Sequence, residues 1–162
     1  MSSLFHGSAL CEVAQDGTVT IPGFLAETLG EGPAELLLSK HDADACLVGY
    51  SRDHLETLST RAEARRLADE ARGDDARNHY RRMRRTFGVV EKLPRAGAIL
   101  TIPAAMRHLG KIETLALFVG AGDSFEIWNP DLAVQSEDAQ FRDLAAYRLQ
   151  THTGSETASG VH

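Results

Sequence analysis

Short apolar runs alternate with glycine-containing turns along most of this chain, and the pattern occurs twice. Residues 17–30 read Gly-Thr-Val-Thr-Ile-Pro, followed by an apolar-periodic stretch that ends in Leu-Gly. Residues 97–110 read Gly-Ala-Ile-Leu-Thr-Ile-Pro, followed by a similar stretch with the same ending. Runs 36–38 and 46–50 match runs 115–118 and 124–128 in the same order. This self-similarity indicates two structural units of about 50 residues each.

The sequence pattern of each unit predicts the same order of strands and helices. Two strands flank a glycine-containing turn, a short helix begins at a proline and ends at a glycine, and two further strands follow. Pro22 with Gly30, and Pro103 with Gly110, mark the two short helices. The predicted strands cover residues 8–13, 18–21, 36–38 and 46–50 in the first unit, and 86–92, 99–101, 115–118 and 124–128 in the second.

Each unit then leads into a predicted helical region. The first covers residues 52–85 and is expected to break near Gly73. The second covers residues 130–149, with Asn129 as its N-cap and Pro130 at its first helical position. The end of the chain is rich in Ser, Thr, Gly and His, and we expect it to be disordered.

A unit of about 50 residues with four short strands buries little surface alone, so the two units are expected to share one core. The predicted fold class is α+β: two tandem swapped-hairpin units that form one pseudo-twofold small β-barrel with flanking helices. The predicted parts are a first unit (4–60), an arginine-rich connecting helical region (61–85), a second unit with its C-terminal helix (86–149) and a disordered tail (150–162).

Composition excludes several classes of protein. Of the 162 residues, 43% are apolar, which suffices for a packed core. No apolar run approaches the roughly 20 residues of a membrane helix, and the first residues lack the basic and apolar regions of a secretion signal. Two cysteines, Cys11 and Cys46, are too few for a disulfide scaffold or a cysteine-based zinc site. We therefore expect a cytoplasmic protein without membrane contact.

Charge is distributed unevenly along the chain, whose net charge is -6. Residues 1–60 carry two basic and nine acidic groups, residues 61–92 carry ten and six, and residues 93–162 carry five and eight, so the balances are -7, +4 and -3. The segment 77–85 contains five arginines and no acid. The overall acidity therefore conceals one basic segment.

The order and spacing of the repeated motifs resemble the MraZ family, whose chains carry two tandem copies of the AbrB/SpoVT swapped-hairpin fold. The matching residues are Phe5 and Gly7, Gly17 with Thr20-Ile21-Pro22, Leu29-Gly30, Tyr50, Gly97 with Thr101-Ile102-Pro103, Leu109-Gly110 and Glu126-Ile127-Trp128. The resemblance covers about residues 4–148. It implies a DNA-binding, nucleoid-associated transcriptional regulator of the division and cell-wall gene cluster, acting as a ring-shaped homo-oligomer on direct repeats upstream of its own gene.

The chain departs from that family at the turn of each unit. Family members carry an Asp-x-x-x-Arg signature there, with the arginine directly after the turn glycine. In the first unit Thr18 follows Gly17, and in the second Ala98 follows Gly97, so neither turn has the arginine. An acid, Asp16, also stands in the first turn. Because Lys and Arg supply phosphate affinity, this loss predicts altered or weakened DNA contacts.

Other arginines are candidates for DNA contact. Arg81, Arg82, Arg84 and Arg85 belong to the basic segment, where Arg77, Arg81 and Arg85 share one helix face. That face either contacts phosphates or is a solvated face that pairs with the acidic first unit or a neighbouring subunit. Arg95, on the second turn, is either a DNA contact or an ordinary exposed charge. Arg107, on the second short helix, is a further candidate, although we favour a structural ion pair there.

The sequence predicts no enzyme, cofactor or small-molecule substrate. The segment 120–123 resembles a dinucleotide loop, but it lacks the third glycine and opens a hairpin. His41, Asp42 and Asp44 are better explained as a polar hairpin turn than as a metal site, because no second ligand cluster is evident. Cys11 and Cys46 are expected to face the core.

Two functions therefore stay open at this point. The first is a MraZ-like DNA-binding regulator with altered contacts, for which promoter DNA and further copies of the chain are the expected partners. The second is an oligomeric scaffold or protein-interaction module that keeps the fold and has lost DNA binding. An antitoxin of the AbrB type is less favoured, because such proteins usually carry one fold copy and an amphipathic partner-binding tail.

Overall fold

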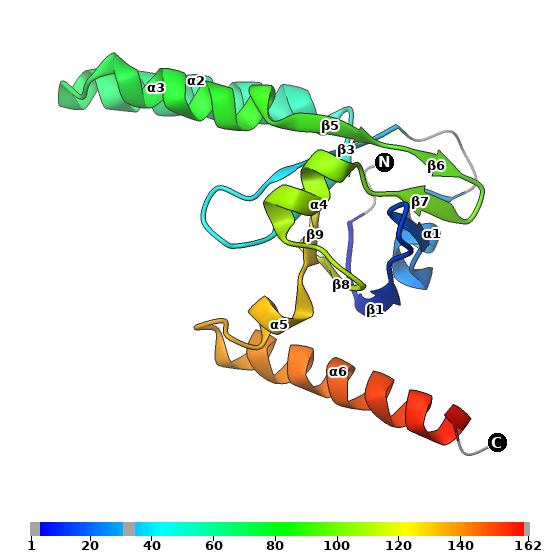
Figure 1. Cartoon of the computed structure of the whole chain (residues 1–162). Helices are drawn as coiled ribbons and strands as arrows, with labels where there is room; N and C mark the ends of the chain where they lie inside the picture. The colour runs from blue at the N-terminus through cyan, green and yellow to red at the C-terminus, as the bar shows by residue number, and fades with distance from the viewer. Residues whose placement is uncertain (1–3, 31–34, 161–162) are drawn as a thin grey trace.

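A computed structural model describes residues 4–30 and 35–160 of the chain (Figure 1). Within this part the protein is a mixed α+β structure with two antiparallel sheets and six α-helices. The strands are β1 (Ser8–Glu12), β2 (Thr18–Thr20), β3 (Leu36–Lys40), β4 (Leu47–Ser51), β5 (Val90–Leu93), β6 (Arg95–Ala96), β7 (Ile99–Thr101), β8 (Leu115–Gly120) and β9 (Phe125–Trp128). The helices are α1 (Gly23–Leu29), α2 (His54–Arg72), α3 (Ala76–Met83), α4 (Ala104–Gly110), α5 (Pro130–Ala133) and α6 (Ala139–Gly160), and a π-helical turn, η1, covers Arg84–Gly88.

The large sheet interleaves the two sequence units. Its strand order is β1-β8-β9-β4-β3-β5, so the first strand of each unit pairs with the third strand of the other. Exchanging the two units leaves this order unchanged, which is the pseudo-twofold relation that the repeat predicts. The central strands β4 and β9 pair antiparallel, with Val48 opposite Glu126. Neither unit completes the sheet alone.

The α+β class is confirmed, but the predicted small β-barrel is not a closed one, because the described strands form two sheets. β2 and β7 pair with each other and with β6 in a small three-stranded sheet, and no ladder joins them to the large sheet. Pro22 and Pro103 lie two residues beyond the ends of these strands. Because proline cannot donate to a ladder, each of these strands ends before its proline.

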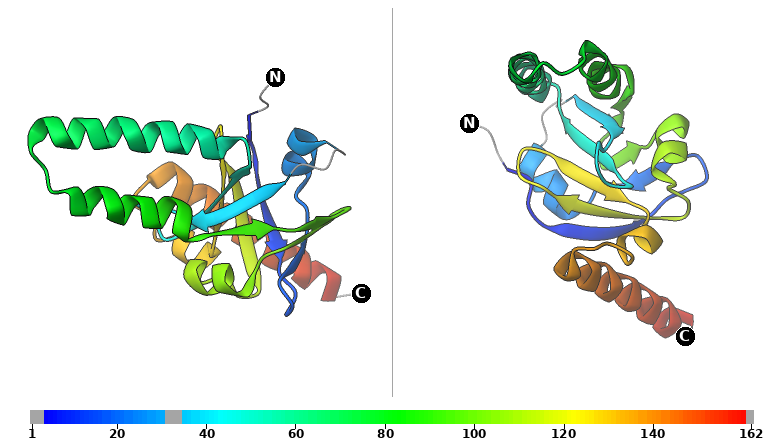
Figure 2. Two further views of the ribbon diagram at one scale, coloured as in Figure 1. Left: turned by 90° about the horizontal axis from the view of Figure 1, so that it is seen from above. Right: turned by 90° about the vertical axis from the view of Figure 1, so that its left-hand side faces the viewer.

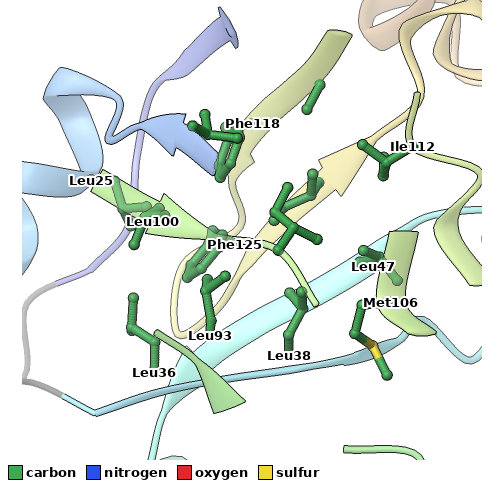
Figure 3. Packing of buried hydrophobic residues seen from close by; sticks show 14 of the residues in the cluster. Leu25, Leu36, Leu38, Leu47, Leu93, Leu100, Met106, Ile112, Phe118 and Phe125 are labelled. Atoms are coloured by element: carbon green, nitrogen blue, oxygen red, sulfur yellow. The ribbon is translucent and has the colours of Figure 1, made fainter. Parts of the chain in front are cut away.

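The main core lies between the two sheets and is covered by α1 and α4 (Figure 3). Phe118, Phe125, Leu25 and Leu100 are all fully buried in it. The rings of Phe118 and Phe125 stack with centroids 6.3 Å apart. Both units contribute to this cluster, as expected for units too small to fold separately.

Two helical layers lie on opposite sides of the body of the protein (Figures 1 and 2). One consists of α2 and α3, and the other of α5 and α6. α5 and α6 bury a second apolar cluster, in which the Trp128 and Phe141 rings lie 4.9 Å apart and Cys46 is fully buried. Cys11 packs against the main core, and burial raises the pKa of its thiol to about 11. Both cysteines therefore face apolar surroundings, as predicted.

The helical regions refine the sequence prediction. The first region does break at Gly73, whose left-handed φ of 76° ends α2. The predicted strand 86–92 begins only at Val90, because η1 continues the helical path to Gly88. Asn129 caps α5 as predicted by accepting from the Asp131 backbone N–H at 2.8 Å.

Two further boundaries differ from the prediction. The second helical region is divided into α5 and α6, and α6 continues through residues 150–160, which the sequence analysis assigns to a disordered tail. No proline follows Pro130 to end that helix. The last two residues of the predicted tail lie outside the described residues. Gly110 belongs to α4, and Lys111, with a φ of 55°, provides the left-handed cap instead.

Helices α2 and α3 form an antiparallel hairpin that projects from the body of the protein (Figure 2). Both helices are rich in charged residues, and in the described structure one ion pair, between Arg82 and Asp69, joins them. Asp69 is the central acceptor: its side chain is 9% exposed and bonds to Arg72 and to Arg82. The hydrogen bond from Arg82 is the largest cause of the lowered pKa of Asp69.

We expect Asp69→Asn to loosen this hairpin, because the variant removes the charge that holds both arginines. Amide hydrogen exchange over α3 should accelerate by about tenfold or more, while the sheets keep wild-type protection. A lowered pKa means that the wild-type contribution is complete above the usual Asp pKa and is lost as pH falls through the folded pKa. Glu56→Gln, on the first turn of α2, is the control, and equal exchange in both variants contradicts the expectation.

Candidate nucleic-acid interface

The turn of the first unit is built around Gly17. The backbone N–H of Ala14 donates to the Thr18 carbonyl at 2.9 Å, and that of Gly17 donates to the Ala14 carbonyl at 2.8 Å. Gly17 has a φ of 90°, and a Cβ atom there would lie 2.5 Å from the Ile102 carbonyl oxygen. The turn therefore requires glycine for its conformation and for its close approach to the second unit.

Asp16 makes this turn anionic. Its carboxylate accepts from the Thr18 backbone N–H at 3.1 Å and from the Thr18 hydroxyl at 2.7 Å. These hydrogen bonds lower the pKa of Asp16, and the charge of Arg107 adds to the effect. The first turn thus presents a carboxylate, which repels phosphate groups.

The turn of the second unit uses its arginine to hold the backbone. Arg95 donates from Nε to the Gly97 carbonyl at 2.9 Å and from Nη1 to the Gly30 carbonyl at 3.0 Å. Gly97 has a φ of 62°. Because these bonds join the second turn to the end of α1, the guanidinium is partly engaged within the protein.

Arg107 has a similar role at the first turn. It donates from Nε to the Ile102 carbonyl at 3.0 Å and from Nη1 to the Gln15 carbonyl at 3.2 Å. The side chain therefore joins α4 of the second unit to the turn of the first. We expected an ion pair for Arg107 from the sequence. The acceptors of its hydrogen bonds are backbone carbonyls instead.

Gly17→Ala is expected to lower the free energy of unfolding by about 1–3 kcal/mol, because it combines a left-handed φ with a backbone collision. Thermal and urea unfolding measure the loss. The matched control is Gly23→Ala at the start of α1, where a Cβ meets nothing within 4 Å and alanine favours the helix. Equal stability of the two variants contradicts this interpretation of the turn.

The basic segment divides into one engaged arginine and several accessible ones. Arg82 points to α2 and binds Asp69. Arg81, Arg84 and Arg85 are exposed and make no ion pair within residues 4–30 and 35–160. Arg77, at the start of α3, is 88% exposed and lies 3.9 Å from Asp75. The accessible guanidinium groups of this helix are available to phosphates.

The candidate residues do not form one surface. Arg95 lies on β6, at the opposite side of the molecule from the projecting α2–α3 hairpin (Figure 1). Arg107 lies on α4 and is committed to the first turn. In the antiparallel small sheet, Thr18 is opposite Thr101, so the two turns lie at opposite ends of the β2–β7 pair. The basic helix is therefore separate from both turns.

The fold also assembles a group that the sequence analysis missed. Glu126, on β9, joins His41 and Asp44 in a cluster whose possible ligand atoms lie within 4.8 Å of one another. The backbone N–H groups of Ala43 and Asp44 donate to His41 Nδ1 at 3.1 and 3.0 Å, so Nε2 carries the ring proton and faces Glu126 at 3.6 Å. A metal-bound histidine instead donates from its second nitrogen, so this tautomer opposes metal binding.

The interleaved sheets and the two glycine turns define a mixed α+β protein built from two related units. No family model matches the sequence. Curated proteins named "Transcriptional regulator MraZ" do match: that of Caldanaerobacter subterraneus is 31% identical over 81% of this chain and 87% of the relative. The protein of Lactiplantibacillus plantarum is 29% identical over 88% of this chain and 96% of the relative, and that of Azotobacter vinelandii is 25% identical over 91% of each.

The chain belongs to the MraZ family. Its curated relatives are named as regulators of transcription and not as enzymes, in agreement with the absence of a catalytic pattern from the sequence. Among the described helices, none is both long and apolar enough to cross a membrane.

Proposed function

We propose that this protein is a DNA-binding transcriptional regulator whose phosphate contacts lie on exposed arginines at the end of α3 and in η1, at the root of the α2–α3 hairpin. The observation that carries the proposal is the set Arg81, Arg84 and Arg85, which are exposed and lack acidic partners in the described structure. Membership of the MraZ family supports DNA as the ligand. The expected target is DNA upstream of its own gene, bound by a ring-shaped homo-oligomer in the nucleoid.

Electrostatics support moving the contact away from the turns. Asp16 is held ionised by Thr18 on the first turn, and Arg95 is engaged by two carbonyls on the second. A surface that binds phosphates gains affinity from unpaired cations, because each neutralised phosphate releases condensed counterions. The hairpin offers those cations and the turns offer fewer.

The test is binding of the full chain to DNA from upstream of its gene over a salt series. Wild-type affinity should fall steeply with salt, and Arg81→Gln with Arg84→Gln should weaken binding and make the slope of log K against log salt shallower by about two. Arg61→Gln with Arg66→Gln is the matched control, because both arginines pair with acids on or near α2. Light scattering reports the oligomeric state of each variant.

Two results would overturn the hairpin assignment. One is wild-type affinity in the Arg81/Arg84 variant with a disturbed oligomer, which places these arginines in a subunit contact. The other is an equal effect of the control pair, which indicates a non-specific response to lost positive charge.

A second candidate function is an oligomeric scaffold or protein-interaction module of the same fold. The anionic first turn favours it, because Asp16 repels the DNA backbone two residues before Thr18, which stands where the family carries its signature arginine. A confirmed oligomer that does not bind DNA even at low salt would select this second function.

A further inference from the structure

A small cavity lies between the outer face of the large sheet and the root of the helical hairpin. Its volume is about 240 Å³, and it is lined from β3, β4, α2, η1 and the β8–β9 turn. Cavities for drug-sized ligands are typically about 300–1,000 Å³, so this one fits a smaller molecule. Its wall includes η1. π-Helical turns are rare in proteins, and those that occur are often found at functional sites.

The cavity lining carries the cations Lys40, Arg61 and Arg85 and the acids Asp42 and Asp123, and among these cations only the Arg85 side chain makes no hydrogen bond or ion pair in the described structure. Arg61 donates from Nη2 to Asp123 at 2.9 Å, so these two charges neutralise each other. Lys40 donates from Nζ to the carbonyls of His41 and Asp44. Arg85 also lines the cavity, and no acid pairs with it in the described structure.

A buried hydroxyl in the wall also lacks a partner. Tyr50 is 2% exposed, and its hydroxyl oxygen is buried without a hydrogen-bond partner in the described structure. Its ring lies 5.3 Å from that of His54, which is 9% exposed and whose Nδ1 is 4.0 Å from Asp123. An unsatisfied buried hydroxyl is costly, and native structures usually satisfy it by a ligand or by water.

We propose that this cavity binds a small oxyanion, a phosphate or a carboxylate, that pairs with Arg85 and accepts a hydrogen bond from the Tyr50 hydroxyl. An ionised oxygen can satisfy both groups at once, because the guanidinium only donates hydrogen bonds and the hydroxyl can donate one to the same anion. Arg85, in η1, is also one of the three exposed arginines, with Arg81 and Arg84, that carry the proposed DNA contact. If the proposed function holds, the bound anion withdraws Arg85 from DNA and lowers DNA affinity.

The experiment measures anion binding to the full chain without DNA, so it stands apart from the test of DNA binding. Isothermal titration with inorganic phosphate, and separately with acetate, is run at constant ionic strength set by chloride. Wild type should show saturable binding, and Arg85→Gln and Tyr50→Phe should each weaken it by about tenfold or more. Arg77→Gln and Tyr80→Phe are the matched controls, because both residues are exposed on the same hairpin and lie outside the cavity.

Tyr50→Phe also separates a binding role from a structural one. No side chain or backbone group of the described residues bonds to the hydroxyl, so its removal should leave the thermal midpoint unchanged or raise it while binding is lost. Saturable binding of either anion that disappears in both cavity variants and persists in both controls supports the proposal. Absence of saturable binding in wild type, or equal binding in all variants, overturns it whatever the result with DNA.

Discussion

Phe125→Ala should destabilise this protein by about 3–5 kcal/mol, the largest loss that we expect from a single substitution. The ring is fully buried between the two sheets, with Phe5 at a centroid distance of 5.3 Å and Phe118 at 6.3 Å. Deleting the ring removes its apolar contacts with both units, because Phe5 belongs to the first unit and Phe118 to the second. It also leaves a cavity at the point where the units meet. Denaturant unfolding followed by far-UV circular dichroism measures the change.

Substitution of Gly49 tests whether the Phe125 ring requires a glycine on the neighbouring strand β4. A Cβ at Gly49 would lie 2.2 Å from Cζ of Phe125, so Gly49→Ala should be strongly destabilising in the wild-type protein. In the Phe125→Ala background the same substitution should cost less, because the colliding ring is gone. A double-mutant cycle should therefore give a coupling of about 0.5–3 kcal/mol, whereas additive effects would contradict this packing. Phe87→Ala, on the partly exposed η1, is the surface control.

The order of elements could be predicted from the sequence because it depends on local patterns. β7 covers residues 99–101 as predicted, and Gly73 ends α2, since β-branched runs and glycine act over a few residues. The internal repeat also predicted the pseudo-twofold relation. Closure of the barrel depends instead on ladders between distant strands, and nothing local indicates that β2 pairs only with β7 and leaves the large sheet open.

The candidate site was only partly predictable for the same reason. The arginine run is visible in the sequence, but the separation of Arg82 from its neighbours depends on Asp69 of another helix. One carbonyl partner of Arg95 lies 65 positions away along the chain, and one of Arg107 lies 92 positions away. Glu126 reaches His41 only because β9 and β4 pair at the centre of the large sheet. Residue type alone cannot distinguish an arginine that is hydrogen-bonded to a turn from one that is free to bind a ligand.

Restoring arginine to both turns should increase DNA affinity more than any other change to this chain. Thr18→Arg with Ala98→Arg places a guanidinium directly after each turn glycine, the position at which the family resemblance locates the DNA contact. Each arginine that reaches a guanine edge contributes roughly 1–3 kcal/mol of discrimination. The double variant should therefore bind upstream DNA at least tenfold more tightly, with a salt slope steeper by about two per chain.

The informative comparison keeps the added charge constant and changes only its position. Thr60→Arg with Gln150→Arg adds the same two charges at exposed sites on α2 and α6. If the turns still face DNA, the turn variant should gain sequence discrimination that this control lacks, because non-specific attraction raises affinity for all DNA equally. Equal gains in both variants would mean that the turns no longer contact DNA. That result would fit the second candidate function, in which the turns with Asp16 and the carbonyl-bound Arg95 belong to a surface that does not bind DNA.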